Sequence, residues 1–185
     1  MIILKIVWVL WLLSEILLNR LLRSTTGDKK KKDKGSLWMI WITIILSINI
    51  GIFLSYYIDL PLGTQPTLII SGTILIVLGM LLRFYSISSL GKFFTVDVTI
   101  REDHTLKTDG IYGWVRHPSY LGSLIFFAGF GISINNWISF LTIIIPVTLV
   151  FLYRIKIEEK VLIEQFGQDY KVYMDNSYHL IPWIY

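Results

Sequence analysis

Two polar stretches lie at the ends of apolar segments in the C-terminal half, and their residue types could bind charged ligands. The first, residues 109–122, reads DGIYGWVRHPSYLG and places Arg116 and His117 directly before Pro118. Proline disfavours a helical conformation in the preceding residue and is favoured at the first helical position, so a helix should begin at Pro118. Its unpaired N–H groups, beside the Arg116 cation, would favour a carboxylate or phosphate. Alternatively, Arg116 reaches lipid phosphate while His117 caps the helix and Tyr120 lies at the membrane interface.

The second stretch, residues 153–167, reads YRIKIEEKVLIEQFG and follows the last apolar segment. Arg154 and Glu158 are four positions apart and share one helix face, a spacing that is also typical of an ordinary ion pair. The last two apolar segments are joined by Asn135-Asn136 alone, which predicts a tight helical hairpin. Such a hairpin would bring Pro118 and Arg154 to the same depth, so we expect the two stretches to share one pocket.

The elements that must position these residues are apolar helices. Of the 185 residues, 54% are hydrophobic and 16% are charged, and the apolar residues occur in blocks, which indicates an integral membrane protein. The absence of cysteine excludes disulfides, thiolate catalysis and zinc–thiolate sites, and we expect no metal ligands. The blocks predict transmembrane helices at about residues 2–22, 37–58, 67–82, 120–134 and 137–153.

The positions of lysine and arginine predict how these blocks cross the bilayer. Of 17 basic residues, all except Lys5 lie at or beyond the ends of the first, third and fifth blocks. Alternate crossing puts them on one face, which the positive-inside rule makes cytoplasmic. We therefore predict one all-α membrane domain, residues 1–185, with about five transmembrane helices, an external N-terminus and a cytoplasmic C-terminus. The 83–119 connector and the C-terminal tail would form a small cytoplasmic cap. Because the basic residues adjoin apolar spans, the net charge of +4 does not indicate nucleic-acid binding.

The first block contains two polar residues, Glu15 and Asn19. A carboxylate inside a membrane span is energetically costly and is often functional. Near the inner end of the helix it could instead hydrogen-bond to another helix, and we favour this structural role.

The two polar stretches together resemble a known family. HTLKTDGIYGWVRHPSYLG, followed by RIKIEEKVLIEQFGQDYKVY and a terminal IP, is similar to the isoprenylcysteine carboxyl methyltransferase family and, less closely, to phospholipid N-methyltransferases. The resemblance covers roughly residues 93–183 and implies a membrane-embedded methyltransferase that uses S-adenosylmethionine. It implies no Rossmann fold, in agreement with the absence of a G-x-G-x-x-G motif after a strand.

The resemblance also implies roles for individual residues. Arg154 would face the methyl acceptor, and Glu158 would complete the cofactor pocket. Some family members carry an amide side chain seven residues before the HTL turn, where this chain has Asp97. The cofactor's carboxylate suits a helix N-terminus and His117, and its cationic ammonium and sulfonium suit Glu158. The cofactor-binding parts would be residues 92–120 and 154–185. In the first of these parts, the residues that would bind the cofactor are His104, Thr105, Leu106, Lys107, Tyr112, His117, Pro118, Ser119 and Tyr120.

Methyl transfer from a sulfonium is an in-line displacement, in which a protein mainly positions the reactants and excludes water. A carboxylate acceptor needs no general base, whereas an amine must first lose a proton, so the residues favour a carboxylate or thiolate. We predict methylation of a lipophilic acceptor that enters sideways from the bilayer, with the carboxylate of an isoprenylcysteine-like molecule favoured. The alternatives are a phospholipid or small-thiol methyltransferase, an NADPH-dependent membrane reductase, and a non-enzymatic scaffold or transporter.

Overall fold

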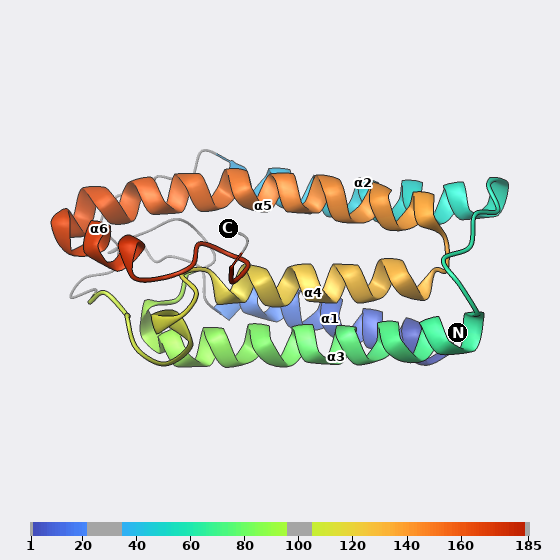
Figure 1. The fold of residues 1–185 in the computed structure, drawn as a ribbon, viewed down its shortest axis with the longest axis horizontal. Coiled ribbons are helices and arrows are strands. Elements are labelled where there is room, and N and C mark those ends of the chain that lie inside the picture. Colours follow the sequence, from blue (N-terminus) through green and yellow to red (C-terminus); the bar gives the residue numbers. More distant parts are fainter. Residues whose placement is uncertain (1, 22–34, 96–104, 184–185) are drawn as a thin grey trace.

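The computed structural model describes residues 2–21, 35–95 and 105–183, and within these ranges the chain forms six α-helices and no β-strand. The five long helices lie lengthwise beside one another, and successive helices run in opposite directions (Figure 1). Two short 3₁₀ helices, Gly91–Phe93 and Gly110–Gly113, follow α3 and precede α4. The α-helices are α1 Ile2–Leu21, α2 Ser36–Tyr57, α3 Gln65–Leu90, α4 Pro118–Ser133, α5 Trp137–Phe166 and α6 Gln168–Asp175.

Three helices of the described part are long and apolar enough to cross a membrane. They are α2, α3 with its extension to Phe93, and α5. Val9–Leu18 within α1 and the whole of α4 are shorter apolar stretches. With 16 residues, α4 is about 24 Å long, somewhat less than the roughly 30 Å of a hydrocarbon core. The predicted all-helical class is confirmed for the described residues, and the number of crossings stays a prediction.

Two helices extend beyond the predicted apolar blocks. α3 continues through Arg83 to Leu90, so the first part of the predicted 83–119 connector is helical. α5 continues past Tyr153 to Phe166 and ends at Gly167, whose φ of 57° favours glycine. The tail that follows residue 153 consequently begins as the end of α5 and continues in the separate α6. Both extensions run beyond the apolar blocks toward the same end of the bundle (Figure 1).

Glycines allow α3 and α4 to pack closely. The most extensive helix contacts join α3 to α4 and α2 to α5, and α4 also packs on α5. A Cβ atom added at Gly79 would lie 2.5 Å from the Gly122 carbonyl oxygen, and one at Gly129 would lie 2.6 Å from the Gly72 carbonyl oxygen. Small residues of this kind let helix backbones approach within a membrane, where association depends on close packing. The contact holds the start of α4, and with it Pro118, against α3.

We expect Gly79→Ala to lower the free energy of unfolding by about 1–3 kcal/mol, because the new methyl group would press against the α4 backbone. Thermal unfolding of the purified chain in detergent measures this effect. Gly63→Ala is the matched control, since its Cβ would lie 3.7 Å from the nearest atom, in the Leu68 side chain. Equal unfolding temperatures for the two variants would contradict the close approach of α3 and α4.

The connection between α4 and α5 is fixed by its two asparagines. Asn135 has a φ of 56°, and its Oδ1 accepts hydrogen bonds from the N–H groups of Leu62 (3.0 Å) and Gly63 (3.1 Å). Asn136 caps α5, since its Oδ1 accepts from the Ser139 N–H at 3.0 Å. The short connection therefore also anchors the loop between α2 and α3.

Candidate active site

A cavity lies beside the first turns of α4 and is lined by residues from all five long helices. Together with the open solvent at its mouth, the space between its walls amounts to about 710 Å³. Apolar side chains, among them Trp11, Ile40, Ile44 and Phe127, form much of its wall. The ionisable and polar groups that line it include Glu15, Arg83, Ser119, Tyr120, Arg154 and Glu158.

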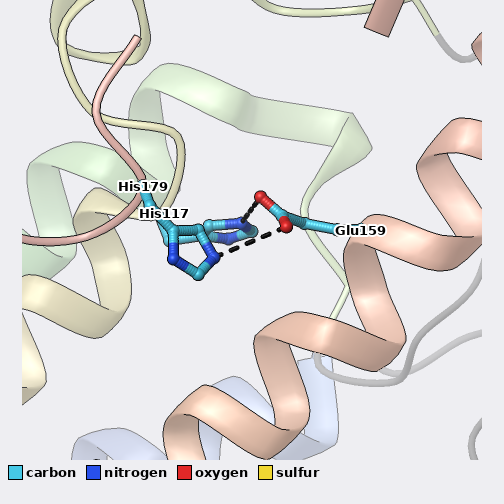
Figure 2. A group of neighbouring side chains, drawn as sticks. All are labelled: His117, Glu159 and His179. Carbon is cyan, nitrogen blue, oxygen red and sulfur yellow. Dashed lines mark hydrogen bonds and ion pairs between the residues drawn. The ribbon is translucent and has the colours of Figure 1, made fainter. Parts of the chain in front are cut away.

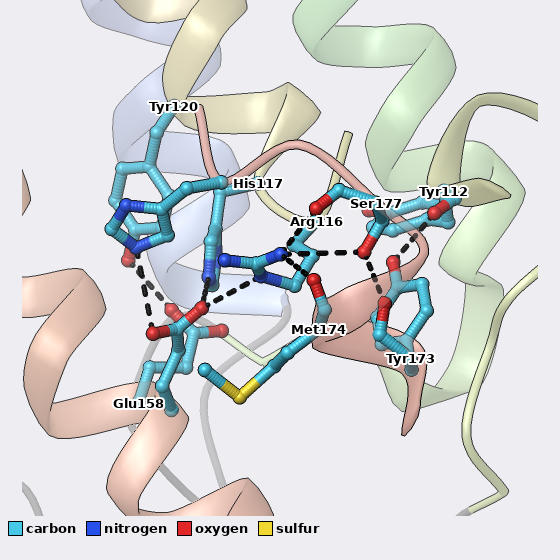
Figure 3. A network of polar contacts seen from close by, with 10 residues as sticks. Tyr112, Arg116, His117, Tyr120, Glu158, Tyr173, Met174 and Ser177 are labelled. Atoms are coloured by element: carbon cyan, nitrogen blue, oxygen red, sulfur yellow. Dashed lines mark hydrogen bonds and ion pairs between the residues drawn. The ribbon is translucent and has the colours of Figure 1, made fainter. Parts of the chain in front are cut away.

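Arg154 and Glu158 lie one helical turn apart on α5, and both line this cavity. Arg154 is only 2% exposed, and its Nη1 donates a hydrogen bond to the Ser36 hydroxyl at the start of α2. The Tyr120 hydroxyl donates to Glu158 Oε2 at 3.1 Å (Figure 3). The two polar stretches of the sequence therefore meet, as predicted, through Tyr120 of α4 and Glu158 of α5.

An ion pair between helices forms part of the cavity wall. Arg83 Nη2 donates to Glu15 Oε2 at 2.8 Å, and its Nε donates to the other carboxylate oxygen, so the pair is bidentate. Arg83 also donates to Ser123 Oγ at 3.0 Å. Such a geometry offsets the cost of burying two charges among apolar helices. Glu15 thus has the interhelical role that the sequence favoured, and it connects α1 to α3; the Asn19 side chain lies outside the described residues.

Arg116 binds the C-terminal segment, a set of contacts that the sequence did not predict. Its Nε donates to Glu159 Oε1 at 3.0 Å, and its Nη1 donates to the carbonyls of Met174 at 2.9 Å and Ser177 at 2.5 Å (Figure 3). Its backbone N–H donates to the Tyr178 carbonyl at 2.9 Å. Arg116 therefore fastens the residues that follow α6 onto the segment that precedes α4.

Two tyrosines hold the same region together. The Tyr112 hydroxyl donates to the Ser86 carbonyl of α3 at 3.1 Å, and the Tyr112 carbonyl accepts from the Tyr173 hydroxyl at 2.6 Å (Figure 3). Burial raises the pKa of Tyr112, and it raises the pKa of Tyr173 to about 12. Both phenols therefore stay neutral donors near neutral pH. Tyr112, which the resemblance places against the cofactor, lies outside the lining of the cavity.

His117 and Pro118 occupy the predicted positions at the start of α4. Pro118 is the first residue of the helix, and His117 is at the N-cap, although its side chain makes no capping hydrogen bond. His117 is 5% exposed, and its Nε2 lies 3.2 Å from Glu159 Oε1. The imidazole therefore faces α5 and lies outside the lining of the cavity.

The structure brings together four of the residues that the resemblance assigns to the site, and places others apart from them. Ser119, Tyr120, Arg154 and Glu158 line the cavity. Lys107 pairs with Asp109, with 2.9 Å between Nζ and Oδ1, and hydrogen bonding from Lys107 lowers the pKa of Asp109. The assigned residues outside the cavity lining are Thr105, Leu106, Lys107, Tyr112, His117 and Pro118, and those outside the described residues are Asp97 and His104.

Sequence reasoning missed several residues at this end of the bundle. Arg83 could have been found as the partner of Glu15, because a carboxylate in an apolar helix needs a buried cation or a proton. Glu159 was visible only as the neighbour of Glu158, on another helix face. Ser36 and His179 gave no signal, because each is a single polar residue far in sequence from the groups it meets.

Comparison with known proteins assigns the chain to a family. A family model described as phospholipid methyltransferase matches residues 67–169, more than half of the 185 residues. The chain belongs to this methyltransferase family. The matched range begins in α3 and ends in α6, so it includes the glycine-lined α3–α4 contact and both polar stretches.

Individual relatives of this methyltransferase family member bear the name of the family that the two polar stretches resemble. Protein-S-isoprenylcysteine O-methyltransferase B of Arabidopsis thaliana is 36% identical over 115 residues, 61% of this chain and 58% of the relative. The Protein-S-isoprenylcysteine O-methyltransferase of Saccharomyces cerevisiae is 35% identical over 115 residues, 61% of this chain and 48% of the relative.

A solved structure is also similar. That of a eukaryotic intramembrane Ras methyltransferase, isoprenylcysteine carboxyl methyltransferase, matches with a TM-score of 0.64 at 30% identity, covering 78% of this chain and 52% of that one. The chain thus spans roughly half the length of the proteins it matches. The predicted resemblance to the isoprenylcysteine carboxyl methyltransferase family is confirmed, and with the apolar helices it shows an integral membrane protein.

Proposed function

We propose that the chain is a membrane methyltransferase that uses S-adenosylmethionine to methylate the carboxylate of an isoprenylcysteine-like acceptor. The observation that carries the proposal is the placement of Arg154 and Glu158, one turn apart, on a cavity whose wall is partly apolar. A cation for an anionic acceptor and an anion for a cationic cofactor therefore lie side by side, and the burial of Arg154 strengthens its interaction with an anion. Relatives named as isoprenylcysteine methyltransferases support this class of acceptor.

The residues of the cavity fit the cofactor by charge and by the contacts they offer. When bound, S-adenosylmethionine supplies an electrophilic methyl group on a sulfonium. Glu158 offers its carboxylate to the ammonium or sulfonium, with Oε2 oriented by the Tyr120 hydroxyl. The rings of Tyr120 and Phe151, with centroids 5.3 Å apart, offer flat contact to adenine. The N–H groups of the first turn of α4, where Ser119 lines the cavity, offer donors to the cofactor's carboxylate.

Arg154 would orient the acceptor. Its guanidinium stays charged and can donate two parallel N–H bonds to a carboxylate, while Ser36 holds Nη1 in place. An ionised carboxylate needs no general base, so the remaining task of the protein is to align its attacking oxygen with the methyl carbon and to exclude water. The new oxygen–carbon bond forms as the carbon–sulfur bond breaks, and the electron pair of that bond stays on sulfur.

The apolar wall suits the lipid tail of the acceptor. Trp11 of α1 stacks on Phe126 with ring centroids 4.7 Å apart, and Ile40 and Ile44 of α2 complete this side of the cavity. We infer that the tail enters sideways from the bilayer along these helices. The distribution of basic residues supports five crossings, with the N-terminus outside and the polar end of the cavity on the cytoplasmic side.

Labelled methyl transfer by the purified full chain in detergent tests this function. We expect a base-labile methyl ester on an S-farnesyl cysteine with an ionised carboxylate, and no label on the matching carboxamide. A base-stable label on a phospholipid amine or on a thiol would overturn the carboxylate acceptor but keep the methyltransferase. Protection of the chain by NADPH and not by S-adenosylhomocysteine would instead indicate a reductase.

A further inference from the structure

Three side chains that commonly bind metals meet beside α5, outside the lining of the cavity. They are His117 before α4, Glu159 of α5 and His179 of the C-terminal segment (Figure 2). Their side chains are 5%, 13% and 14% exposed, in that order. Both histidines turn a ring nitrogen toward the carboxylate (Figure 2). Possible metal-ligand atoms from three segments that are distant in sequence therefore lie close together.

Two of the spacings between these atoms are close to those around a tetrahedral ion. His117 Nε2 lies 3.2 Å from Glu159 Oε1, His179 Nε2 lies 3.5 Å from Glu159 Oε2, and the ligand atoms of the three residues all lie within 4.8 Å of one another. Zinc binds imidazole nitrogen and carboxylate oxygen at about 2.0–2.2 Å, so neighbouring ligands of a tetrahedral ion are about 3.4 Å apart. Small side-chain rotations would complete such a site.

The surrounding charges select the kind of ion. Arg116 Nε also bonds to Glu159 Oε1, at 3.0 Å, and an outer hydrogen bond of this kind orients a ligating carboxylate. The guanidinium charge weakens the attraction of Glu159 for any cation, so the two neutral imidazoles must supply most of the affinity. This favours an ion that prefers nitrogen, such as Zn²⁺, over Mg²⁺ or Ca²⁺, which prefer oxygen.

We propose that His117, Glu159 and His179 form a binding site for a divalent metal ion of the Zn²⁺ type. The ion would connect the start of α4, the extension of α5 and the C-terminal segment, alongside the Arg116 contacts to Met174 and Ser177. Because these three side chains lie outside the cavity lining, the ion would stabilise the cap and take no part in methyl transfer.

Metal content of the purified full chain tests the site. After treatment with a chelator, the chain in detergent is dialysed against Zn²⁺, and bound zinc is measured by mass spectrometry. We expect one Zn²⁺ per chain, and binding at least about 10-fold weaker in His179→Gln and Glu159→Gln. Zinc should also raise the unfolding temperature of the wild-type chain and leave that of His179→Gln unchanged. Replacement by Co²⁺ should give the visible absorption of a tetrahedral ion.

The third histidine of the chain provides a matched control, because His104→Gln should keep wild-type zinc binding. Helical circular dichroism without metal shows that each variant folds. An equal zinc dissociation constant for the wild-type chain and His179→Gln would overturn the site, and so would loss of zinc in His104→Gln alone. A wild-type chain that transfers methyl groups and binds no zinc would overturn the metal site and leave the proposed function intact.

Discussion

Replacing Arg154 with lysine should lower kcat/KM for a carboxylate acceptor by about 10²–10³-fold, the usual cost of losing an oriented donor in an active site. Lysine keeps the positive charge but lacks the planar fork that bonds a carboxylate through two N–H groups. Arg154 is buried in the cavity wall, and its Nη1 donates to the Ser36 hydroxyl. A lysine side chain at this position could not reproduce both this hydrogen bond and the two bonds to a carboxylate. Initial rates with labelled cofactor and S-farnesyl cysteine measure this effect.

The matched control for this variant is Lys156→Ala. Lys156 is an exposed cation two positions further along α5, and its loss should leave the rate near that of the wild-type chain. Cofactor affinity should also be close to wild type in Arg154→Lys, because Glu158 and the start of α4 are unchanged. A wild-type kcat/KM for Arg154→Lys would show that this residue does not hold the acceptor.

Replacing Glu158 with glutamine should weaken S-adenosylmethionine binding by about 10- to 100-fold, as expected for one lost charged hydrogen bond. Glutamine keeps the size of the side chain and an oxygen that can accept from the Tyr120 hydroxyl, now 3.1 Å from Glu158 Oε2. The variant therefore removes the charge with little change in packing. Calorimetry on the chain in detergent measures the dissociation constant.

S-adenosylhomocysteine refines this test, because it keeps the ammonium and lacks the sulfonium charge. If Glu158 contacts the sulfonium, Glu158→Gln should weaken S-adenosylhomocysteine binding less than S-adenosylmethionine binding, and equal losses would indicate the ammonium. Glu164→Gln is the control, since Glu164 is an exposed carboxylate further along the same helix. Unchanged affinity for both ligands in Glu158→Gln would remove this residue from the cofactor site.

The sequence predicted the features that depend on local chemistry. Apolar blocks become helices wherever they occur, and Pro118 begins α4 as its fixed φ requires. Asn135 and Asn136 do make the short connection between α4 and α5. The meeting of Tyr120 with Glu158 could also be predicted, because that connection sets the relative depth of the two helices. The family followed from motifs that are continuous in the chain.

Local patterns could not predict where the helices end. An apolar block ends where its hydrophobicity ends, at about residue 82 or 153, yet α3 and α5 continue to Leu90 and Phe166. The extensions are stabilised by contacts with the connector and the tail, such as the Tyr112 hydrogen bond to the Ser86 carbonyl. Hydropathy reports burial in lipid and carries no information about such polar contacts.

The sequence by itself thus determined a membrane-embedded helical chain, its family, and the two polar stretches that form the candidate site. Only the tertiary structure shows which polar groups bond to one another and stabilise that site. Glu15 pairs with Arg83 across 68 positions, and Arg116 binds Ser177 across 61. It also decided that His117 faces Glu159 and His179 instead of the cavity. The physical reason is that a buried charge must be paired with a polar group that lies close to it in the folded chain. The hydrophobic periodicity of the sequence does not show which group that is.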